Sequence, residues 1–312
     1  MNAFHRRLYA VVNPKADLGR ASRFWPNLQK QLRERIGPFL WDWTRSPMHA
    51  TFLVRSALQQ GYDLIVSVGG DGTHNEVING FFTDGAILKP QAALSVVSCG
   101  SGSDLCRSLG IASGIASTLE TILSGRELEV DVGHLQFSRP SGLSCERLFL
   151  NIASLGLSAR VNSNLGSQPH FLGGSGRFFL ATVRTLIANR HDRVSLEIDG
   201  KVFSDQLIST VAAANGQFFG GGMRIAPHAR LDDGLLDVVM IGAVSLLDFI
   251  RWGRRFYQGR YLSRPRIQYW KARTIRARSE VPVPVEVDGE TVGTLPASFT
   301  VLPGTVRILV PG

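Results

Sequence analysis

The spacing of hydrophobic residues divides this chain into two parts. In roughly the first 125 residues, short apolar runs alternate with stretches in which apolar side chains recur every three or four positions. The runs at 8–12, 39–44, 64–68 and 92–97 predict buried strands, and the stretches that follow them predict helices. This alternation predicts a doubly wound α/β domain. The loops after the first, third and fourth runs should gather at the carboxyl edge of its parallel sheet, where such sheets bind ligands.

From about residue 129 onward, the pattern has the period of two that β-strands show. Runs at 128–137, 148–154, 193–198, 206–213, 235–241, 272–277, 283–287 and 298–302 predict an antiparallel, β-sandwich-like domain with inserted helices at 177–188 and 246–257. Asp199-Gly200 and Asp288-Gly289 are typical of hairpin turns. The predicted domains are 1–132 and 133–303. Residues 304–312, with a last strand at 307–310, could return to the first domain.

The composition indicates a globular cytoplasmic protein. Apolar residues make up 44% of the chain, which is enough for a packed core. Cys99, Cys106 and Cys145 are too few and too scattered for a disulfide framework or a zinc site, which favours a reducing cytosol. The N-terminal segment has no apolar core of a signal peptide, and no run approaches the roughly 18 apolar residues of a membrane span.

The charge of the chain suggests an anionic partner. The net charge is +9, which suits a nucleotide, a nucleic acid or an acidic membrane surface. Segment 251–278 holds ten Lys and Arg residues and neither Asp nor Glu, and six aromatic residues are interleaved with them. One interpretation is a solvated face whose aromatic residues lie in the core. The other is a surface that lies on anionic lipid at the inner face of the membrane.

The stretch 63–80 points most directly to chemistry. An apolar run leads into Gly-Gly-Asp-Gly at 69–72, and Thr73 with Glu76 then opens a helix as a capping box. A glycine turn before a helix N-terminus makes a phosphate cradle, because backbone N–H groups and the helix dipole can approach an anion closely. An ordinary βα loop also uses such glycines. Asp71, however, would repel phosphate unless a metal ion or a proton lay between them, which indicates a magnesium nucleotide.

Two further carboxylates follow along the chain. Gly-Ser-Gly-Ser-Asp at 100–104 repeats the pattern of glycines, hydroxyls and a carboxylate at a helix start, and Asp131 ends the strand at the junction of the two domains. Each of them also has a plain structural interpretation: Asp104 as an N-cap and Asp131 as a hydrogen-bonded junction residue.

Six motifs in a fixed order resemble the diacylglycerol-kinase catalytic family. They are Asn13-Pro14, Gly-Gly-Asp-Gly-Thr at 69–73, the loop at 100–104, the segment 151–156, Ala-Pro-His-Ala-Arg-Leu-Asp-Asp-Gly at 226–234 and Val-Asp-Gly-Glu at 287–290. The family includes bacterial diacylglycerol and related lipid kinases and the sphingosine and ceramide kinases. The resemblance covers nearly the whole chain. It implies that the γ-phosphate of ATP is transferred, with Mg²⁺, to the hydroxyl of a lipid.

The resemblance also implies roles for individual residues. ATP would be bound by Asn13, Pro14, Arg20, Thr44, Gly69, Gly70, Asp71, Gly72, Thr73, Asn75, Glu76, Gly100, Ser101 and Gly102. Magnesium and its waters would be held by Asp71, Asp104 and Asp131, and a structural magnesium site would be formed by Asp233 with the backbone carbonyls of Arg230 and Leu235. Asp288 would be the general base, with Glu290 beside it and Asp71 as a further catalytic carboxylate, so these side chains are predicted to converge.

Some of these assignments have competing interpretations. Asp288 is part of an Asp-Gly hairpin turn like that at Asp199, and from the residues alone both are turn residues. Only the resemblance and the neighbouring Glu290 favour a catalytic Asp288, and Asp233 could likewise be a turn residue. The chain also departs from the family, which usually has Pro where Ser98 stands and Asn where Ser103 stands; any contact from that amide is therefore in doubt.

Other features leave the substrate and the partners open. The glycines at 220–222 could gate a lipid or merely turn, and Phe171, Phe178 and Phe179 could line an acyl crevice or pack in the core. Diacylglycerol, phosphatidylglycerol and sphingoid bases all fit a lipid kinase. NAD kinase, which shares the Gly-Gly-Asp-Gly loop, and a regulatory nucleotide-binding module are alternatives. No nucleic-acid motif accompanies the basic segment, and an exposed sheet edge could pair two copies into a homodimer.

Overall fold

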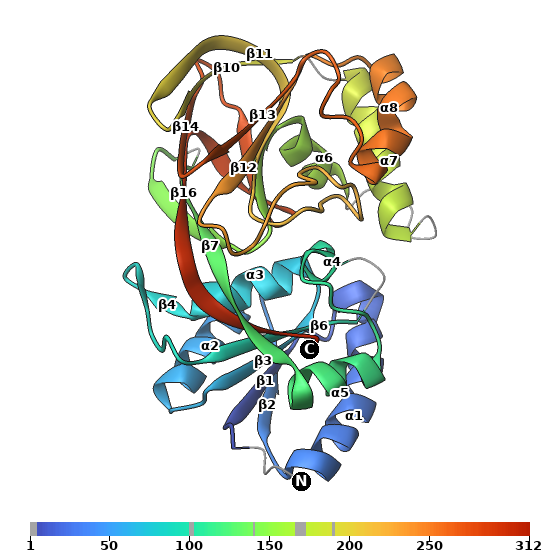
Figure 1. Cartoon of the computed structure of the whole chain (residues 1–312), viewed down its shortest axis with the longest axis vertical. Helices are drawn as coiled ribbons and strands as arrows, with labels where there is room; N and C mark the ends of the chain where they lie inside the picture. The colour runs from blue at the N-terminus through green and yellow to red at the C-terminus, as the bar shows by residue number, and fades with distance from the viewer. Residues whose placement is uncertain (1–4, 100–102, 140, 166–172, 189–190) are drawn as a thin grey trace. The chain divides into compact units, whose positions relative to one another are not determined.

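The computed structural model describes residues 5–99, 103–139, 141–165, 173–188 and 191–312, which form two compact units (Figure 1). Unit 1 comprises Met1–Val130 and Gly304–Gly312, and unit 2 comprises Asp131–Pro303. Strands β7 (Arg126–Ser138) and β16 (Glu290–Val310) run through the boundary, so each unit contains a part of both strands.

Unit 1 is an α/β domain built on a parallel sheet with the strand order β2, β1, β3, β6. The end of β16 adds a further parallel strand beside β6, with Arg307 opposite Ala93. The strands are β1 (Leu8–Val12), β2 (Leu40–Trp43), β3 (Leu64–Gly69) and β6 (Ala93–Ser98), and β4 (Phe82–Thr83) with β5 (Ala86–Ile87) forms a separate hairpin. The helices are α1 (Ala16–Ile36), α2 (His49–Gln59), α3 (Asp71–Gly80), α4 (Asp104–Ser108) and α5 (Ile115–Ser124).

The strands of unit 1 form where the apolar runs predicted them. Every residue of β1, β3 and β6 is buried, as expected for a parallel sheet covered on both faces. On one face, Trp25 and Leu28 of α1 and Leu119 of α5 pack against alternate residues of these strands. Each such side chain stabilises the fold by about 1.5–3 kcal/mol relative to exposure to water. The predicted doubly wound α/β class is confirmed.

Six strands of unit 2 close into an antiparallel ring. Strand β11 pairs with β10, β10 with β14, β14 with β16, β16 with β15, β15 with β9, and β9 with β11. Strands β12 and β13 extend the ring from β11, and β7 with β8 extends it from β16. The remaining bounds are β8 (Ser144–Phe149), β9 (Ile152–Gly156), β10 (Asp192–Ile198), β11 (Lys201–Ala214), β12 (Leu236–Gly242), β13 (Ile267–Ala272), β14 (Thr274–Arg278), β15 (Pro284–Val287), α6 (Leu157–Leu165), α7 (Gly173–Ala188) and α8 (Leu246–Gln258). The predicted β-sandwich-like class with inserted helices is confirmed.

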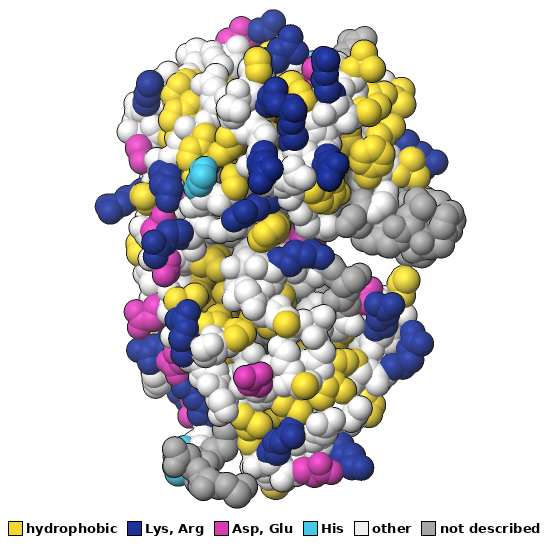
Figure 2. All heavy atoms as spheres, turned by 45° about the vertical axis from the view of Figure 1, so that its right-hand side comes forward, with side chains coloured by type: hydrophobic (Ala, Val, Ile, Leu, Met, Phe, Trp, Pro, Cys, Tyr) yellow, Lys and Arg dark blue, Asp and Glu magenta, His cyan; other side chains and the backbone are white. Residues whose placement is uncertain are grey.

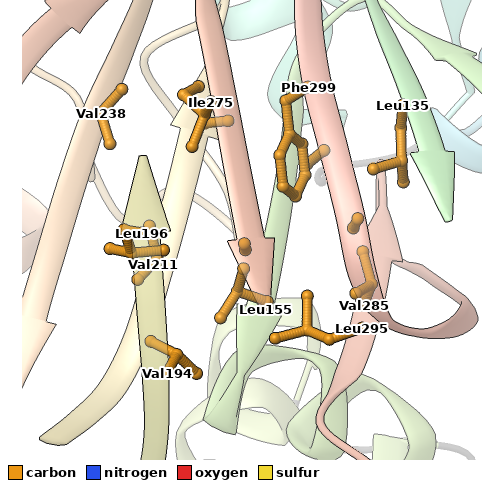
Figure 3. Close-up of a cluster of buried hydrophobic side chains, with 14 of the residues drawn as sticks. Leu135, Leu155, Val194, Leu196, Val211, Val238, Ile275, Val285, Leu295 and Phe299 are labelled. Carbon is orange, nitrogen blue, oxygen red and sulfur yellow. The ribbon is translucent and has the colours of Figure 1, made fainter. Parts of the chain in front are cut away.

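Unit 2 has two hydrophobic cores because strand residues alternate between two buried faces. Val211 of β11 points into the first core with Leu155, Ile275 and Phe299 (Figure 3). Its neighbour Ala212 belongs to the second core, which helices α6, α7 and α8 cover. Burial on both faces explains why β11 contains a run of apolar residues instead of a strict alternation with polar ones.

Unit 2 differs from the sequence-based expectation in several elements. The run 148–154, predicted as one strand, forms parts of β8 and β9, because the chain turns a corner at Leu150 and Asn151. Helix α6 and strand β13 were not predicted, and the run 298–302 is part of the much longer β16. Strand β13 lies within the basic segment 251–278, and Trp270 with Lys271 breaks the alternation of apolar and polar residues along it.

The aromatic residues of the basic segment 251–278 largely face inward. Trp252, Phe256 and Tyr261 are buried in the core under the helices, and the Tyr261 hydroxyl donates to the Ile225 carbonyl. The membrane interpretation of this segment is therefore wrong in one respect, because these aromatic side chains are not available to a lipid surface. Helix α8, which leads into this segment, begins with a capping box: Ser245 Oγ accepts from Asp248 N, and the Asp248 carboxylate accepts from Ser245 N.

Candidate functional site

The carboxyl edge of the unit 1 sheet gathers the polar residues that follow its strands. Asn13 follows β1, Thr44 follows β2 and Gly70 follows β3. Asn13 Nδ2 donates to Thr73 Oγ1 at 2.9 Å, which joins the loops after β1 and β3. Thr44 N donates to the Val12 carbonyl at 2.9 Å and so holds the loop after β2 against the end of β1. The predicted meeting of the loops after the first and third runs is confirmed, and the loop after β2 lies at the same edge.

The first glycine loop is shorter than predicted. Gly69 ends β3, Gly70 is the N-cap of α3, and Asp71 with Gly72 already belongs to the first helical turn. A Cβ on Gly69 would lie 2.5 Å from the Thr73 side chain, so only glycine fits there. A Cβ on Gly70 would meet nothing within 4 Å, so its backbone faces open space at a helix N-terminus. At this position an anion can approach the backbone N–H groups closely and lies at the positive end of the helix dipole.

The capping box predicted at residues 73–76 is wrong, because the helix begins two residues earlier. Thr73 Oγ1 accepts from Asn13, and Glu76 Oε2 accepts from Ala50 N at 3.2 Å, so Glu76 caps the first turn of α2. Asn75 is buried and faces Asn79 in the same helix, and Asn79 Nδ2 donates to the Asn75 carbonyl at 2.8 Å. The structure thus gives Glu76 a role in packing α2 against α3, and the nucleotide contacts predicted for Asn75 and Glu76 stay predictions.

Asp71 joins the two predicted glycine loops. Its carboxylate accepts from Ser103 Oγ at 2.8 Å, from Asp104 N at 3.0 Å and from Leu105 N at 3.2 Å. Burial raises the pKa of Asp71, and these three hydrogen bonds oppose that rise. Ser103 therefore makes a contact that its departure from the family pattern did not suggest. Gly100, Ser101 and Gly102 lie outside the described residues.

The remaining predicted nucleotide contacts lie near the start of α1. Pro14 is in the turn after β1, and Arg20 is in the first part of α1. Asp17 and Leu18, with φ of 47° and 56°, interrupt the helical geometry of α1 just before Arg20. Arg20 Nη1 donates to Asp17 Oδ2 at 3.1 Å, and both side chains reach solvent.

The carboxylates of unit 1 do not form a closed metal cage. Asp104 Oδ1 accepts a hydrogen bond from Arg107 Nη1 at 2.5 Å. The Asp71 carboxylate accepts the three hydrogen bonds from residues 103–105 described above. Among the residues that the structure describes, no group of three or more His, Cys, Asp or Glu side chains is placed to hold a metal ion. An ion that arrives with a nucleotide needs only one or two carboxylates from the protein, and the contact of Asp71 and Asp104 with Mg²⁺ stays a prediction.

In unit 2, Asp288 anchors the corner between β8 and β9. Its Oδ1 accepts from Asn151 N at 3.2 Å and Ile152 N at 2.9 Å, and its Oδ2 accepts from Leu150 N at 3.3 Å. Asp199, in the other Asp-Gly hairpin, does the same for a second corner: its carboxylate accepts from the backbone N–H groups that follow β13. Both aspartates have φ of 45°. The local geometry of Asp288 is therefore that of a hairpin anchor.

Asp288 differs from Asp199 in its neighbours. Glu290 Oε2 accepts from Arg147 Nη2 at 3.2 Å, so a guanidinium of strand β8 lies beside this hairpin. Asn151, whose backbone binds Asp288, also donates through Nδ2 to the Phe218 carbonyl at 2.7 Å, next to the glycines at 220–222. Those glycines form a turn that Phe219 and Met223 close with two backbone hydrogen bonds. Because Asp71 and Asp288 belong to different units, their convergence stays a prediction.

The carboxylate of the predicted structural magnesium site is paired with donors of the chain itself. Asp233 Oδ2 accepts from Lys271 Nζ at 2.5 Å, and its Oδ1 accepts from Leu235 N at 3.2 Å. The Arg230 side chain pairs with Asp232, and the binding of Mg²⁺ by the carbonyls of Arg230 and Leu235 stays a prediction. The ammonium of Lys271 supplies the positive charge at this site and also lies 3.8 Å from Asp237 Oδ2. Lys271 was not identified from the sequence, where it was one basic residue among ten.

Asp131 binds this same loop. Its Oδ2 accepts from Gly234 N at 2.6 Å, its N donates to the Leu231 carbonyl at 2.7 Å, and its carbonyl accepts from Asn215 Nδ2 at 2.8 Å. Asp131 therefore holds the 231–234 segment as a buried junction residue. Its assignment to a magnesium network with Asp71 and Asp104 stays a prediction.

Glu286, on the strand that leads to Asp288, was not singled out from the sequence. The residue is 2% exposed, Ser154 Oγ donates to its Oε1, and its Oε2 has no hydrogen-bond partner among the described residues. Burial raises the pKa of Glu286 to about 7, and the charge of Asp288 adds to the rise. Val285 and Val287 point into the first core, so Glu286 lies on the opposite face of β15, where Ser154 and helix α6 cover it.

A chain of hydroxyls leads from Glu286 to a pocket. Ser154 Oγ lies 2.6 Å from Ser158 Oγ, which lies 2.7 Å from Thr210 Oγ1. Ser158 and Thr210 line a cavity of about 60 Å³ whose other walls are mainly apolar. These walls are Leu157, Val161, Phe219, Met223, Ile225, Ile241, Val244, Phe249 and Phe256, with Thr182 and Ser209.

The phenylalanines predicted to line an acyl crevice lie near this pocket or cannot be placed. Phe179 of α7 stacks on Phe249, which lines the pocket, with ring centroids 5.5 Å apart. Phe171 and the side chain of Phe178 lie outside the described residues. In the part of the chain that the structure describes, no helix is long and apolar enough to cross a membrane.

The fold and these sites define a class of protein. An α/β domain with a glycine loop at a helix N-terminus is joined to an antiparallel β domain with an apolar pocket. The diacylglycerol kinase catalytic domain model matches residues 7–135, and the model described as YegS C-terminal NAD kinase beta sandwich-like domain matches residues 151–310. The chain belongs to the diacylglycerol kinase catalytic-domain family.

Relatives of this family align with most of the chain. A protein named diacylglycerol kinase from Bacillus subtilis is 28% identical over 263 residues, which are 84% of this chain and 82% of the relative. Another of the same name from Staphylococcus carnosus is 26% identical over 86% of this chain and 83% of the relative. A crystal structure of a diacylglycerol kinase from Bacillus anthracis has the same fold, with a TM-score of 0.75 at 24% identity over 98% of this chain and 97% of that one.

Proposed function

We propose that this protein is an ATP-dependent lipid kinase that transfers the γ-phosphoryl group to a lipid hydroxyl. The observation that carries the proposal is the family membership of both halves of the chain, with relatives named diacylglycerol kinase over most of its length. In this proposal, residues 1–132 with 304–312 bind the nucleotide, and residues 133–303 bind the lipid. The reaction takes place at the inner face of the membrane, where a cytoplasmic enzyme meets its substrate.

In the nucleotide domain, the chain's own residues bind and orient the phosphates. The open backbone at Gly70 and the N-terminus of α3 receive the anion, Arg20 adds positive charge, and Asn13 and Thr44 border the same edge. Asp71 keeps the second loop in place through its three hydrogen bonds. Mg²⁺ bound with the nucleotide, near Asp71 and Asp104, would neutralise charge on the β- and γ-phosphates.

In the lipid domain, the apolar pocket lined by α8 and the 219–223 turn would receive part of an acyl chain, whose CH₂ groups each gain about 0.8 kcal/mol on burial. Asp288 accepts the proton of the attacking hydroxyl, and three backbone N–H groups fix its carboxylate. The lipid oxygen forms a bond to the γ-phosphorus, and the bond from that phosphorus to the bridging oxygen breaks. ADP leaves with the electron pair.

The two Asp-Gly hairpins provide a matched test of the general base. Asp288→Asn and Asp199→Asn each change a hairpin aspartate with the same φ and the same kind of backbone contacts. The two variants should lose similar stability, because both weaken an anchor. Only Asp288→Asn should also lose phosphoryl transfer, by about 100-fold or more, since general-base catalysis contributes about 10²–10⁴-fold.

The assay supplies labelled ATP with a panel of a short-chain diacylglycerol, phosphatidylglycerol, a sphingoid base and NAD, followed by mass spectrometry of the product. A phosphorylated lipid supports the proposal and identifies its substrate class. Phosphorylated NAD with unchanged lipids would replace it with NAD kinase, which shares the glycine loop. Equal activity of Asp288→Asn and wild type would remove Asp288 as the base.

A further inference from the structure

Helix α8 carries two different faces. Phe249, Trp252 and Phe256 point into the core under the helices, and Phe249 and Phe256 also line the apolar pocket. On the opposite side, Leu247 is 78% exposed and Ile250 is 56% exposed. The packing of unit 2 does not explain why two large apolar side chains, one helical turn apart, are this exposed on the outward side of a helix.

Two arginines share this outward side. Residues three, four and seven positions apart lie on one side of a helix, so Arg251 and Arg254 flank Leu247 and Ile250. We call these four residues the α8 outer face. Both arginines are exposed, and within the described residues neither has a carboxylate in ion-pair contact. The single acid of α8, Asp248, is engaged by the N-cap and lies 3.7 Å from Arg266 Nη1.

The neighbouring helix α7 also carries exposed apolar side chains. Phe179 of α7 is 41% exposed and stacks on Phe249 of α8, and Ile187 near the end of α7 is 69% exposed. Figure 2 shows Lys and Arg side chains among hydrophobic ones over the face of unit 2 that carries these helices. Apolar side chains interleaved with unpaired guanidinium groups complement a surface that presents anionic groups above hydrocarbon.

We infer that the α8 outer face docks on a bilayer of anionic phospholipid. The apolar residues enter the boundary between headgroups and acyl chains, and the two arginines bind the phosphates above it. Because the inner face of the same helix lines the pocket, docking brings the pocket next to the lipids that fill it. The inference rests on the proposed lipid kinase function, but it concerns binding and is measured without turnover.

The first test is co-sedimentation of the full chain with vesicles of mixed phosphatidylglycerol and phosphatidylcholine. Arg251→Gln with Arg254→Gln should weaken the partition coefficient roughly 30-fold, because each basic residue near an anionic surface contributes about fivefold. Arg33→Gln with Arg35→Gln, on the exposed side of α1, removes the same two charges and should leave binding within about twofold. Thermal unfolding by circular dichroism checks that both double variants remain folded.

A second pair of variants tests the apolar residues. Leu247→Ser with Ile250→Ser should reduce vesicle binding at least tenfold, whereas Val202→Ser with Leu207→Ser, two exposed apolar positions on β11, should not. Wild-type binding should also fall with added salt and be weak on vesicles of pure phosphatidylcholine. Equal loss in test and control pairs would overturn the inference. The inference would also be overturned if the Arg251→Gln, Arg254→Gln variant lost binding to an RNA oligonucleotide but kept its binding to vesicles.

Turnover on a short-chain diacylglycerol dispersed in water separates this inference from the proposed function. Variants of the α8 outer face should keep the wild-type rate on that substrate and lose rate on vesicles. If wild type binds vesicles through this face but phosphorylates no lipid, the docking stands and the proposed function fails. If wild type phosphorylates the short-chain lipid and does not bind anionic vesicles, the function stands and the docking fails.

Discussion

Replacing Glu286 by Gln should abolish a pH dependence of stability in unit 2. The carboxyl is buried beside Ser154, and its pKa is raised from 4.5 to about 7 by burial, with a smaller contribution from Asp288. Between these two pH values the unfolded chain has released the proton and the folded chain retains it. The free energy of unfolding therefore falls as the pH rises through this window, and the contribution of the protonated carboxyl is lost above pH 7.

The size of the effect follows from the shift. A pKa difference of about 2.5 units, at 1.36 kcal/mol per unit, corresponds to about 3 kcal/mol between pH 4.5 and 8. For a domain of this size, about 3 kcal/mol moves the unfolding midpoint by roughly 6–12 °C. Gln keeps an acceptor for Ser154 and does not titrate. Burial of the Gln amide costs the same free energy at every pH. The slope of the unfolding midpoint with pH is therefore the informative quantity.

The measurement is thermal unfolding followed by circular dichroism at several pH values from about 5 to 8.5. Glu280→Gln, at an exposed position of the same unit, serves as the control and should keep the wild-type slope. In the wild type the unfolding midpoint should fall as the pH rises across this range, and in Glu286→Gln most of that fall should be absent. If Glu286→Gln and wild type show the same slope, Glu286 is ionised in the folded protein over this whole range and the reasoning from its burial is wrong.

Three further predictions concern other positions. Gly69→Ala should destabilise unit 1 by about 2 kcal/mol or more, because the new Cβ would meet the Thr73 side chain. Gly70→Ala should be nearly neutral, and urea unfolding of the two variants compares their stabilities. Lys271→Met should lower the free energy of unfolding by about 1–2 kcal/mol, allowing for the partial exposure of Lys271. EDTA should leave the unfolding midpoint of the wild type unchanged, and a large effect of EDTA would favour the predicted magnesium site at Asp233. Burial lowers the pKa of His74 to about 3, so its ring resonances in NMR should not titrate between pH 5 and 8.

The sequence by itself determined the strands of unit 1 and the fold class of both units. Runs such as 8–12 and 64–68 are apolar on both faces, a local property that needs no knowledge of neighbours. The same holds for the capping box at Ser245, because its partner Asp248 lies three residues away, and for the Asp-Gly turn at Asp288, because its positive φ is a property of the turn itself. The order of the motifs also sufficed for the family, since the motifs extend over nearly the whole chain.

Only the tertiary structure decided which polar groups meet. Asp71 and Ser103 lie on different loops, and Asp233 and Lys271 are 38 positions apart, so no local pattern connects them. Glu286 is buried because helix α6 covers the face of β15 opposite its two valines, and this burial raises the pKa of the carboxyl. Helix α8 was divided in the same way. Packing drew Phe249, Trp252 and Phe256 inward and left Leu247, Ile250 and two arginines outside, because a helix can bury only one side.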